Sequence, residues 1–281
     1  MKIKMTSKDF FLIKNYIEEK CGITIGDEKV YLLEARLMKL IEDFKLSDFG
    51  ELYSMIAGKN HPEVQEKVIN AITINETLWF RDKTSWSVLE DILMPVFISD
   101  LRQGKRAKIR IWSAACSTGQ EPYSTAMCID SYLENNGIKD IGLSHFEMLA
   151  TDISHTVLDT ARKGEYDDIA ISRGMDKACR NKYFKCGERS WILDEKIKQP
   201  VHFNYFNLQN SFLFLGKFDI VFCRYVTIYF SEKLKDEVLN KMAMCLEPSG
   251  VLFLGGSELF PNYREYFEMV DYKGGVYYVK K

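Results

Sequence analysis

The sequence has little that would support a metal centre or a membrane span. Its seven cysteines include no Cys-x-x-Cys pair, it has only four histidines, and no His-Glu-x-x-His motif occurs, so we expect no metal site. No apolar run approaches the ~20 residues that a membrane-spanning helix needs. The N-terminus lacks the uninterrupted apolar stretch of a signal peptide. We therefore expect a cytoplasmic protein whose thiols are reduced and which does not insert into membranes.

The sequence also lacks an excess of charge of either sign. Lys and Arg number 38 and Asp and Glu number 40, which gives a net charge of −2 and argues against bulk binding of nucleic acid. The chain has 281 residues, of which 46% are hydrophobic and 28% charged. That composition is typical of a globular protein, and the length is enough for two domains.

The first part of the chain, residues 1–75, is predicted to form a helical domain. Its clearest amphipathic helix runs from Glu28 to Phe44. The apolar residues that fall on one face of this helix at 3.6-residue spacing are Val30, Leu33, Leu37, Leu40 and Ile41. Three basic residues, Lys29, Arg36 and Lys39, lie beside that face. They form either a solvated flank or a basic contact surface for an acidic helical partner.

The second part, residues 76–281, is predicted to be an α/β domain. Short β-rich runs alternate here with helical stretches, which favours a doubly wound, mainly parallel sheet. These runs are Ile109–Trp112, Phe146–Ala150, Phe218–Phe222 and Val251–Leu254. The stretch Tyr183–Leu208 breaks the alternation, and we expect it to form a small antiparallel β-subdomain inserted in the sheet domain.

Candidate ligand-binding residues follow the predicted strands, where doubly wound sheets bind their ligands. Small residues come after Trp112, and Gly119 then opens a helix, as in a nucleotide-binding loop, although a tight strand–helix turn fits equally well. Asp152 ends the next strand, where a carboxylate can accept hydrogen bonds from ribose hydroxyls or cap the following helix. At the junction of the two domains, Thr73–Asp82 mixes aromatic and charged residues, as either a cleft wall or a packing segment would.

Taken together, six segments resemble the CheR type of chemotaxis receptor methyltransferase, over roughly residues 5–280. In order along the chain they read TINETLWFRD, IWSAACSTGQEPYS, ATDIS, NLQ, FDIVFCRYVTIYF and FLGGSE. The resemblance implies an N-terminal helical domain followed by a Rossmann-like methyltransferase domain that carries a small β-subdomain. It further implies transfer of a methyl group from S-adenosylmethionine to glutamate side chains on the cytoplasmic helices of chemoreceptors, which leaves S-adenosylhomocysteine. We expect the chain to act as a monomer.

The resemblance also implies roles for individual residues. Positions that hold the cofactor in similar proteins match Asn75, Thr77, Arg81, Glu121, Asp152, Asn207, Leu208, Tyr225 and Val226. Asp152 would take the ribose hydroxyls, Asn207 and Leu208 the adenine edge, and Glu121 the positively charged end. Arg81 and Tyr229 would steer the substrate carboxylate as the catalytic residues, and Lys29, Arg36 and Lys39 would guide the acidic receptor helix. The ring of Trp79, Phe80 or Tyr229 would favour the sulfonium through a cation–π contact.

One position departs from the family pattern. Similar proteins read Cys-Arg-Asn-Val where this chain reads Cys223-Arg224-Tyr225-Val226. The bulky phenol of Tyr225 either turns away from the cofactor pocket or crowds it. The alternative function is therefore a catalytically impaired, CheR-like regulatory module that binds S-adenosylmethionine without turning it over.

Overall fold

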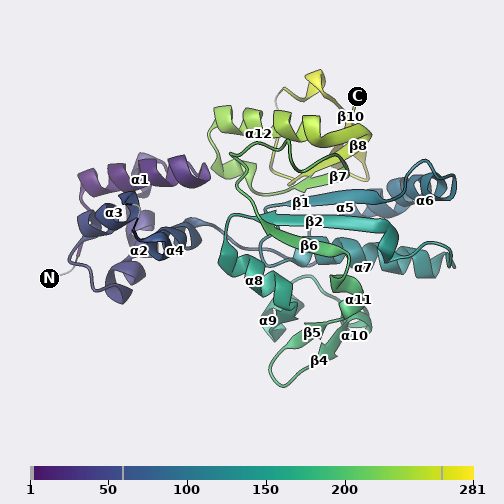
Figure 1. The fold of residues 1–281 in the computed structure, drawn as a ribbon, viewed down its shortest axis with the longest axis horizontal. Coiled ribbons are helices and arrows are strands. Elements are labelled where there is room, and N and C mark those ends of the chain that lie inside the picture. The colour runs from purple at the N-terminus through teal and green to yellow at the C-terminus, as the bar shows by residue number, and fades with distance from the viewer. Residues whose placement is uncertain (1–2, 59, 261) are drawn as a thin grey trace.

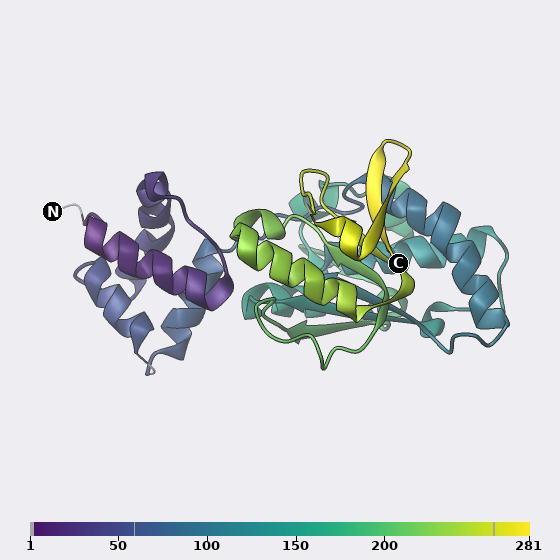
Figure 2. The ribbon, with the colours of Figure 1, turned by 90° about the horizontal axis from the view of Figure 1, so that it is seen from above.

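The protein consists of a helical part and a larger part built around a sheet, which lie side by side (Figures 1 and 2). The computed structural model describes residues 3–58, 60–260 and 262–281. Within these ranges no helix is both long and apolar enough to cross a membrane.

The helical part holds four helices around its own apolar core. They are α1 (Ser7–Cys21), α2 (Val30–Asp43), α3 (Phe49–Ala57) and α4 (Pro62–Ile72). A capping box starts α1, since the Thr6 side chain accepts from the Asp9 N–H and the Asp9 carboxylate accepts from the Thr6 N–H. The predicted apolar face of α2 is buried, although Val30 at its first turn is only half-buried.

The main sheet has seven strands in the order β6-β2-β1-β7-β8-β10-β9. The first five of these are parallel, and β10 pairs antiparallel with both β8 and β9. The strands are β1 (Ile109–Ala114), β2 (Phe146–Asp152), β6 (Val201–Tyr205), β7 (Phe218–Cys223), β8 (Leu246–Leu254), β9 (Phe267–Tyr272) and β10 (Gly275–Lys280). The mainly parallel, doubly wound prediction is confirmed.

Helices cover both faces of this sheet (Figure 1). Side chains alternate between the faces along each strand, so Ile111 and Phe222 join one core whereas Trp112 and Val221 join the other. Helix α12 (Glu232–Cys245) packs on the Trp112 face. The helices on the opposite face are α5 (Lys83–Val88), α6 (Met94–Arg102), α7 (Gln120–Asn135) and α8 (His155–Lys163).

A small antiparallel sheet lies beside the main one, but its bounds differ from the predicted insertion. It contains β3 (Glu165–Tyr166), β4 (Phe184–Cys186) and β5 (Trp191–Leu193), in the order β3-β5-β4. The prediction that residues 183–208 form the subdomain is wrong for β6, which pairs parallel with β2 at the edge of the main sheet. Val201 and Phe203 are buried and His202 is exposed, so β6 alternates like an edge strand.

Hydrogen bonds tie the helical part to the strand ends of the sheet part. The Thr24 N–H donates to the Tyr229 carbonyl at 2.8 Å, and Ile23 forms an antiparallel bridge with Phe230. In the loop after β6, the Asn207 side chain donates to the Lys20 carbonyl at 2.7 Å. The helical part is therefore held against the edge where ligands are expected.

The chain crosses between the two parts through residues 73–82, and Trp79 anchors this segment. Its indole N–H donates to the Ala170 carbonyl and its backbone N–H to the Arg173 carbonyl, both at 3.0 Å. The ring packs edge-on against Tyr166 and Phe184 in the core below the small sheet. Gly174 lies so close that a Cβ there would be 2.2 Å from the Trp79 carbonyl oxygen.

Gly174→Ala is expected to lower the free energy of unfolding by about 2 kcal/mol or more. The new methyl group would meet backbone, and Gly174 has a φ of 100° that alanine rarely adopts. Gly104→Ala is the matched control, because its φ is 67° and no heavy atom lies within 4 Å of the added Cβ. Urea unfolding of both variants checks this, and an equal loss in the two would contradict the role given to the Trp79 contact.

Candidate active site

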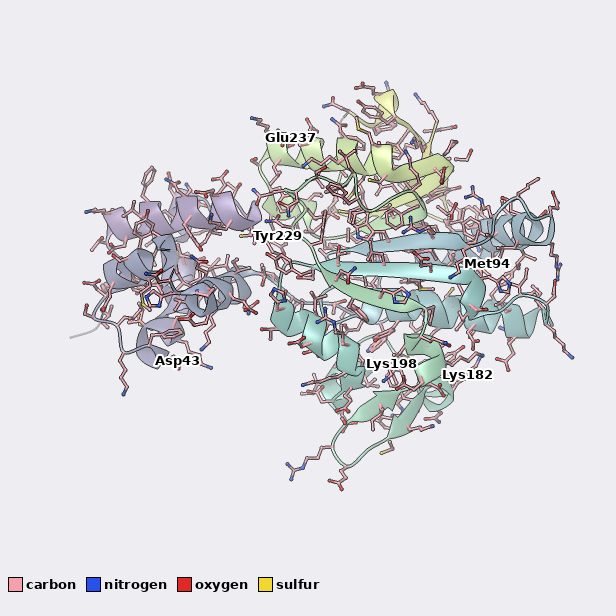
Figure 3. The ribbon with its side chains drawn as sticks, in the orientation of Figure 1. Asp43, Met94, Lys182, Lys198, Tyr229 and Glu237 are labelled. Atoms are coloured by element: carbon pink, nitrogen blue, oxygen red, sulfur yellow. The ribbon has the colours of Figure 1, made fainter. Side chains whose placement is uncertain are left out.

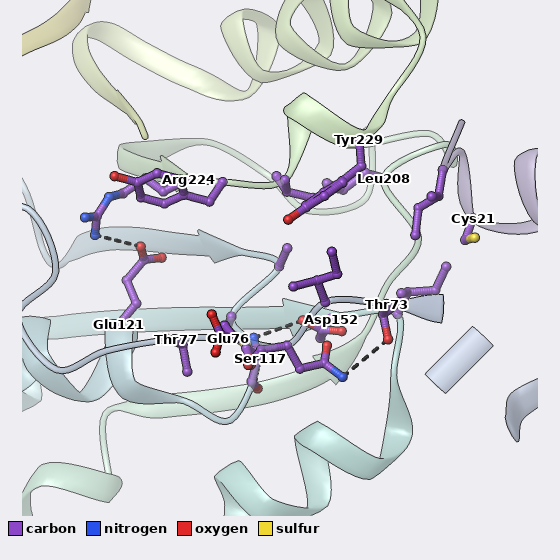
Figure 4. Close-up of a pocket in the computed structure, with 18 of the residues that line it drawn as sticks. Cys21, Thr73, Glu76, Thr77, Ser117, Glu121, Asp152, Leu208, Arg224 and Tyr229 are labelled. Atoms are coloured by element: carbon purple, nitrogen blue, oxygen red, sulfur yellow. Dashed lines mark hydrogen bonds and ion pairs between the residues drawn. The ribbon is translucent and has the colours of Figure 1, made fainter. Parts of the chain in front are cut away.

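A cleft of about 970 Å³ opens at the carboxyl ends of β1, β2 and β7, facing the helical part (Figure 4). All nine residues predicted to hold the cofactor line it, and so does Tyr229. They come from the junction segment, the ends of the strands and the helix that follows β1. The structure thus brings together residues that lie far apart in the sequence, and their individual roles remain predictions.

The floor of the cleft is the loop between β1 and α7, which has unusual backbone geometry. Ala115, Ser117 and Gly119 all have positive φ, at 62°, 51° and 91°. For a residue other than glycine this conformation costs roughly 1–2 kcal/mol. Two hydrogen bonds hold the loop, from the Cys116 N–H to the Thr151 carbonyl at 2.9 Å and from the Ser117 N–H to the Asp152 carboxylate at 2.9 Å. Strain of this kind is typical of ligand-binding loops.

Asp152 is a buried carboxylate at the end of β2. Its two oxygens accept from the backbone N–H groups of Ser117 and Ser154, at 2.9 and 3.0 Å. Within the described residues it has no ion-pair partner. Burial raises the pKa of Asp152 above its ordinary value, against the opposing effect of these N–H groups. Because a carboxylate has about four lone-pair sites, two hydroxyl groups of a ligand can still be accepted here.

At the other end of the cleft, Arg224 links three segments of the chain. Its guanidinium donates to Glu121 on α7 at 3.0 Å and to the Asp82 carboxylate at 2.7 Å, and also to the Arg81 carbonyl. The Arg224 side chain is 2% exposed. Burial raises the pKa of Glu121 in spite of the guanidinium beside it. Burial acts in the same direction on Asp82, but the hydrogen bonds from Arg224 and Tyr225 outweigh it and lower that pKa.

Tyr225, the residue that departs from the family pattern, lies in the cleft wall. Its φ is 60°, a conformation that asparagine tolerates better than tyrosine. The Glu258 carboxylate fixes the turn by accepting from the backbone N–H groups of residues 225–228. The Tyr225 hydroxyl donates to Asp82 at 2.7 Å, and the Arg81 guanidinium carbon lies 3.3 Å from the centre of the ring. The phenol therefore packs beneath Arg81.

Several predicted contacts need correction. Trp79 and Phe80 do not line the cleft, because the first is anchored below the small sheet and the second packs against Trp86. Of the three rings proposed for the sulfonium, only Tyr229 lies in the cleft wall. The side-chain amide of Asn207, which was predicted to meet the adenine edge, instead donates to the Lys20 carbonyl and accepts from the Gln209 N–H.

The three basic residues on or beside α2 are not in the main cleft. Lys29 and Arg36 line a second, neighbouring cavity, and the Arg36 guanidinium donates to the Ile72 carbonyl. Lys39 is exposed farther along the helix and lines neither cavity.

Sequence reasoning missed Arg224, Asp82 and Glu258 as organisers of the site. Arg224 directly follows β7 and Glu258 follows β8, so both lie at strand ends. The strand-end rule does point to the stretches 223–229 and 255–258 that contain these two residues, but it does not give their roles or their partners.

The cleft fits the S-adenosylmethionine that the resemblance implies. Its wall combines apolar side chains with a few polar and charged groups, as is typical of a small-molecule site. It holds acidic side chains for ribose hydroxyls and for a cation. It also holds the buried Nε of Arg224, which has no hydrogen-bond partner among the described residues and suits an acceptor such as a carboxylate.

Binding of S-adenosylhomocysteine is expected to weaken as the pH falls. The ionised Asp152 is the better acceptor for hydroxyl groups, and its raised pKa means that protonation begins at a higher pH than for an ordinary aspartate, whose pKa is about 3.9. Calorimetric titration from neutral to acidic pH measures this. Asp152→Asn should bind more weakly and lose most of the pH dependence. Wild-type affinity that stays constant down to the ordinary pKa would argue against the role of Asp152.

Tyr225→Asn is expected to tighten binding of S-adenosylhomocysteine severalfold. Asparagine tolerates the positive φ, opens space in the wall and frees Arg81 from the ring. Tyr225→Phe is the matched control, since it keeps the ring and removes only the hydroxyl that donates to Asp82. If calorimetry gives the same dissociation constant for Tyr225→Asn as for the wild type, the phenol does not weaken binding of S-adenosylhomocysteine.

Comparison with known proteins gives the family. The model described as the SAM-binding domain of CheR methyltransferase matches residues 75–276, and the CheR all-alpha domain matches residues 8–73. The chain is 41% identical over 275 residues to the chemotaxis protein methyltransferase Cher2 of Pseudomonas putida, covering 97% of this chain and 98% of that protein. It is 40% identical over 281 residues to a chemotaxis protein methyltransferase of Vibrio parahaemolyticus, covering 99% of each. The chain therefore belongs to the CheR methyltransferase family.

Proposed function

We propose that this methyltransferase forms methyl esters on glutamate side chains of chemoreceptor cytoplasmic helices. The observation that carries the proposal is Arg81, which lines the cleft and has no ion-pair partner among the described residues. Its guanidinium rests on the Tyr225 ring and makes only a long contact, 3.5 Å, to the Glu76 carbonyl. An arginine in this state is suited to receive a carboxylate.

Tyr229 is the second residue that we assign to the substrate. It lines the cleft on the side of the helical part, and its backbone carbonyl accepts from Thr24 there. This hydrogen bond fixes the backbone of Tyr229, a residue that lines both the cleft and the neighbouring cavity. Together Arg81 and Tyr229 would hold an incoming carboxylate by charge and by a phenol hydrogen bond.

The reaction demands positioning more than acid–base chemistry. A glutamate side chain has a pKa of about 4.3, so it is ionised at neutral pH and needs no general base. When bound, S-adenosylmethionine supplies a methyl group on a sulfonium, which a carboxylate oxygen takes as the S–C electron pair returns to sulfur. Both charges disappear in that step, so a site that excludes water favours it. Arg81 must therefore orient the carboxylate without neutralising it completely.

The substrate helix would approach along the helical part. Lys29, Arg36 and Lys39 give this side a positive flank, which suits the acidic helices of a receptor. Because the receptor segment is cytoplasmic, we place the enzyme in the cytoplasm. We further propose that the enzyme acts as a monomer.

The alternative, a module that binds S-adenosylmethionine without turnover, is not favoured. The relatives that match nearly the whole chain are named as chemotaxis methyltransferases. The one feature that raised the alternative was Tyr225, and this ring packs beneath Arg81 and leaves a cleft of about 970 Å³.

The test is transfer of tritiated methyl from labelled S-adenosylmethionine to receptor-bearing membranes, with the ester identified by release of methanol in base. The wild type is expected to label the receptor, and Arg81→Ala to lower kcat/KM about tenfold or more, because the carboxylate loses its orienting cation. Arg173→Ala is the control, since it removes an exposed arginine that pairs only with Glu76. No base-labile label with the wild type would overturn the proposal, and normal turnover by Arg81→Ala would remove Arg81 from the site.

A further inference from the structure

A second cavity, of about 530 Å³, lies between the helical part and Tyr229. Aliphatic side chains of the helical part form most of its wall. They include Ile25, Leu32 and Leu33 on and before α2 and Ile72 at the end of α4. None of the nine residues predicted to hold the cofactor lines this cavity.

The two cavities adjoin, since Ile23, Ile74 and Tyr229 line both. These three residues separate the two cavities. Two of them are also firmly placed, because the Thr24 N–H donates to the Tyr229 carbonyl and Ile23 bridges to Phe230. Figure 3 shows Tyr229 where the helical part meets the sheet part. A ligand that reaches the cleft past Tyr229 thus passes the mouth of the second cavity.

The chemistry of this cavity is apolar with positive charge beside it. Leu32 is 36% exposed and Ile74 45% exposed, although both are aliphatic. Lys29 and Arg36 also line the cavity, and neither has a carboxylate within ion-pair distance in the part of the chain that the structure describes. An apolar side chain flanked by acidic residues would satisfy both features at once.

We propose that the second cavity receives an apolar side chain of the receptor helix, one helical turn from the glutamate that is methylated. This inference rests on the proposed function and adds a determinant of which glutamates are modified. On a helix, residues three or four apart lie about 5–6 Å from each other on one face. Two such side chains can enter two adjoining cavities that share Ile23, Ile74 and Tyr229 as lining residues. Lys29 and Arg36 then face the acidic residues on the same helix.

Leu32 offers the sharpest probe, because it lines the second cavity but not the cleft. Leu32→Lys is expected to lower kcat/KM about tenfold on a receptor fragment without substitutions. Calorimetry should also show weaker binding of that fragment. Affinity for S-adenosylhomocysteine should stay at the wild-type value, since the cleft is untouched. Tyr31→Lys is the matched control, as it makes the same change at the neighbouring, 72% exposed position that lines neither cavity.

A complementary substitution in the receptor gives a second test. An apolar residue three or four positions from one strongly labelled glutamate is replaced by Asp, and labelling of each glutamate is followed by mass spectrometry. The wild-type enzyme should lose labelling of that glutamate alone, and Leu32→Lys should restore it, while Tyr31→Lys should not.

The outcomes separate the two proposals. If the wild type labels the receptor but Leu32→Lys does not restore labelling of the substituted receptor, this inference alone is overturned. The cavity would then be a feature of packing between the two parts. No base-labile label with the wild type would overturn the proposed function and this inference with it.

Discussion

The cleft depends on one buried cation. Arg224 follows β7 and is almost fully buried, and a guanidinium in that position is strongly unfavourable unless acidic groups and carbonyls surround it. Its partners come from elsewhere, with Glu121 on α7 and Asp82 at the end of the junction segment. Satisfying Arg224 therefore requires that the junction segment pass across the strand ends. The same path brings Asn75, Thr77 and Arg81 to the cleft.

A second constraint acts on the turns around the cleft. Ala115, Ser117 and Tyr225 all have positive φ, which a non-glycine residue adopts only when its surroundings enforce it. Asp152 enforces the first turn by accepting from Ser117, and Glu258 enforces the second by accepting from four successive N–H groups. Each carboxylate thus shapes a wall of the cleft before any ligand arrives. Local strain is balanced by charge-assisted hydrogen bonds, as is common at preorganised sites.

The sequence predicted the sheet, and the residues that it proposed for the site line one cleft, because both predictions follow from short-range patterns. The four apolar runs became β1, β2, β7 and β8, and the residues that follow the first three line the cleft. The prediction failed where tertiary pairing decides. The run at Val201 is short enough to join either sheet, and only its parallel register with β2 assigns it to the main one.

The sequence pattern also could not predict the direction in which a side chain points. Trp79 and Arg81 are two residues apart in one motif, yet the indole is locked beneath the small sheet and the guanidinium lines the cleft. Nothing in the spacing of aromatic and charged residues distinguishes these outcomes, since the contacts of Trp79 come from residues about ninety positions later in the chain. Likewise, the sequence shows three cations on or just before α2, but only the fold places Lys29 and Arg36 at a cavity and leaves Lys39 outside.

Under the proposed function, selectivity has to reside in docking rather than in chemistry. Every ionised glutamate is an equally competent nucleophile, so the reacting group gives the enzyme nothing by which to choose among them. Arg81 recognises the carboxylate alone and is likewise indifferent to its neighbours. Discrimination must then come from side chains near the glutamate on the receptor helix. The surface that such side chains meet first is the wall around Tyr229, where an aliphatic cavity and two unneutralised cations lie beside the cleft.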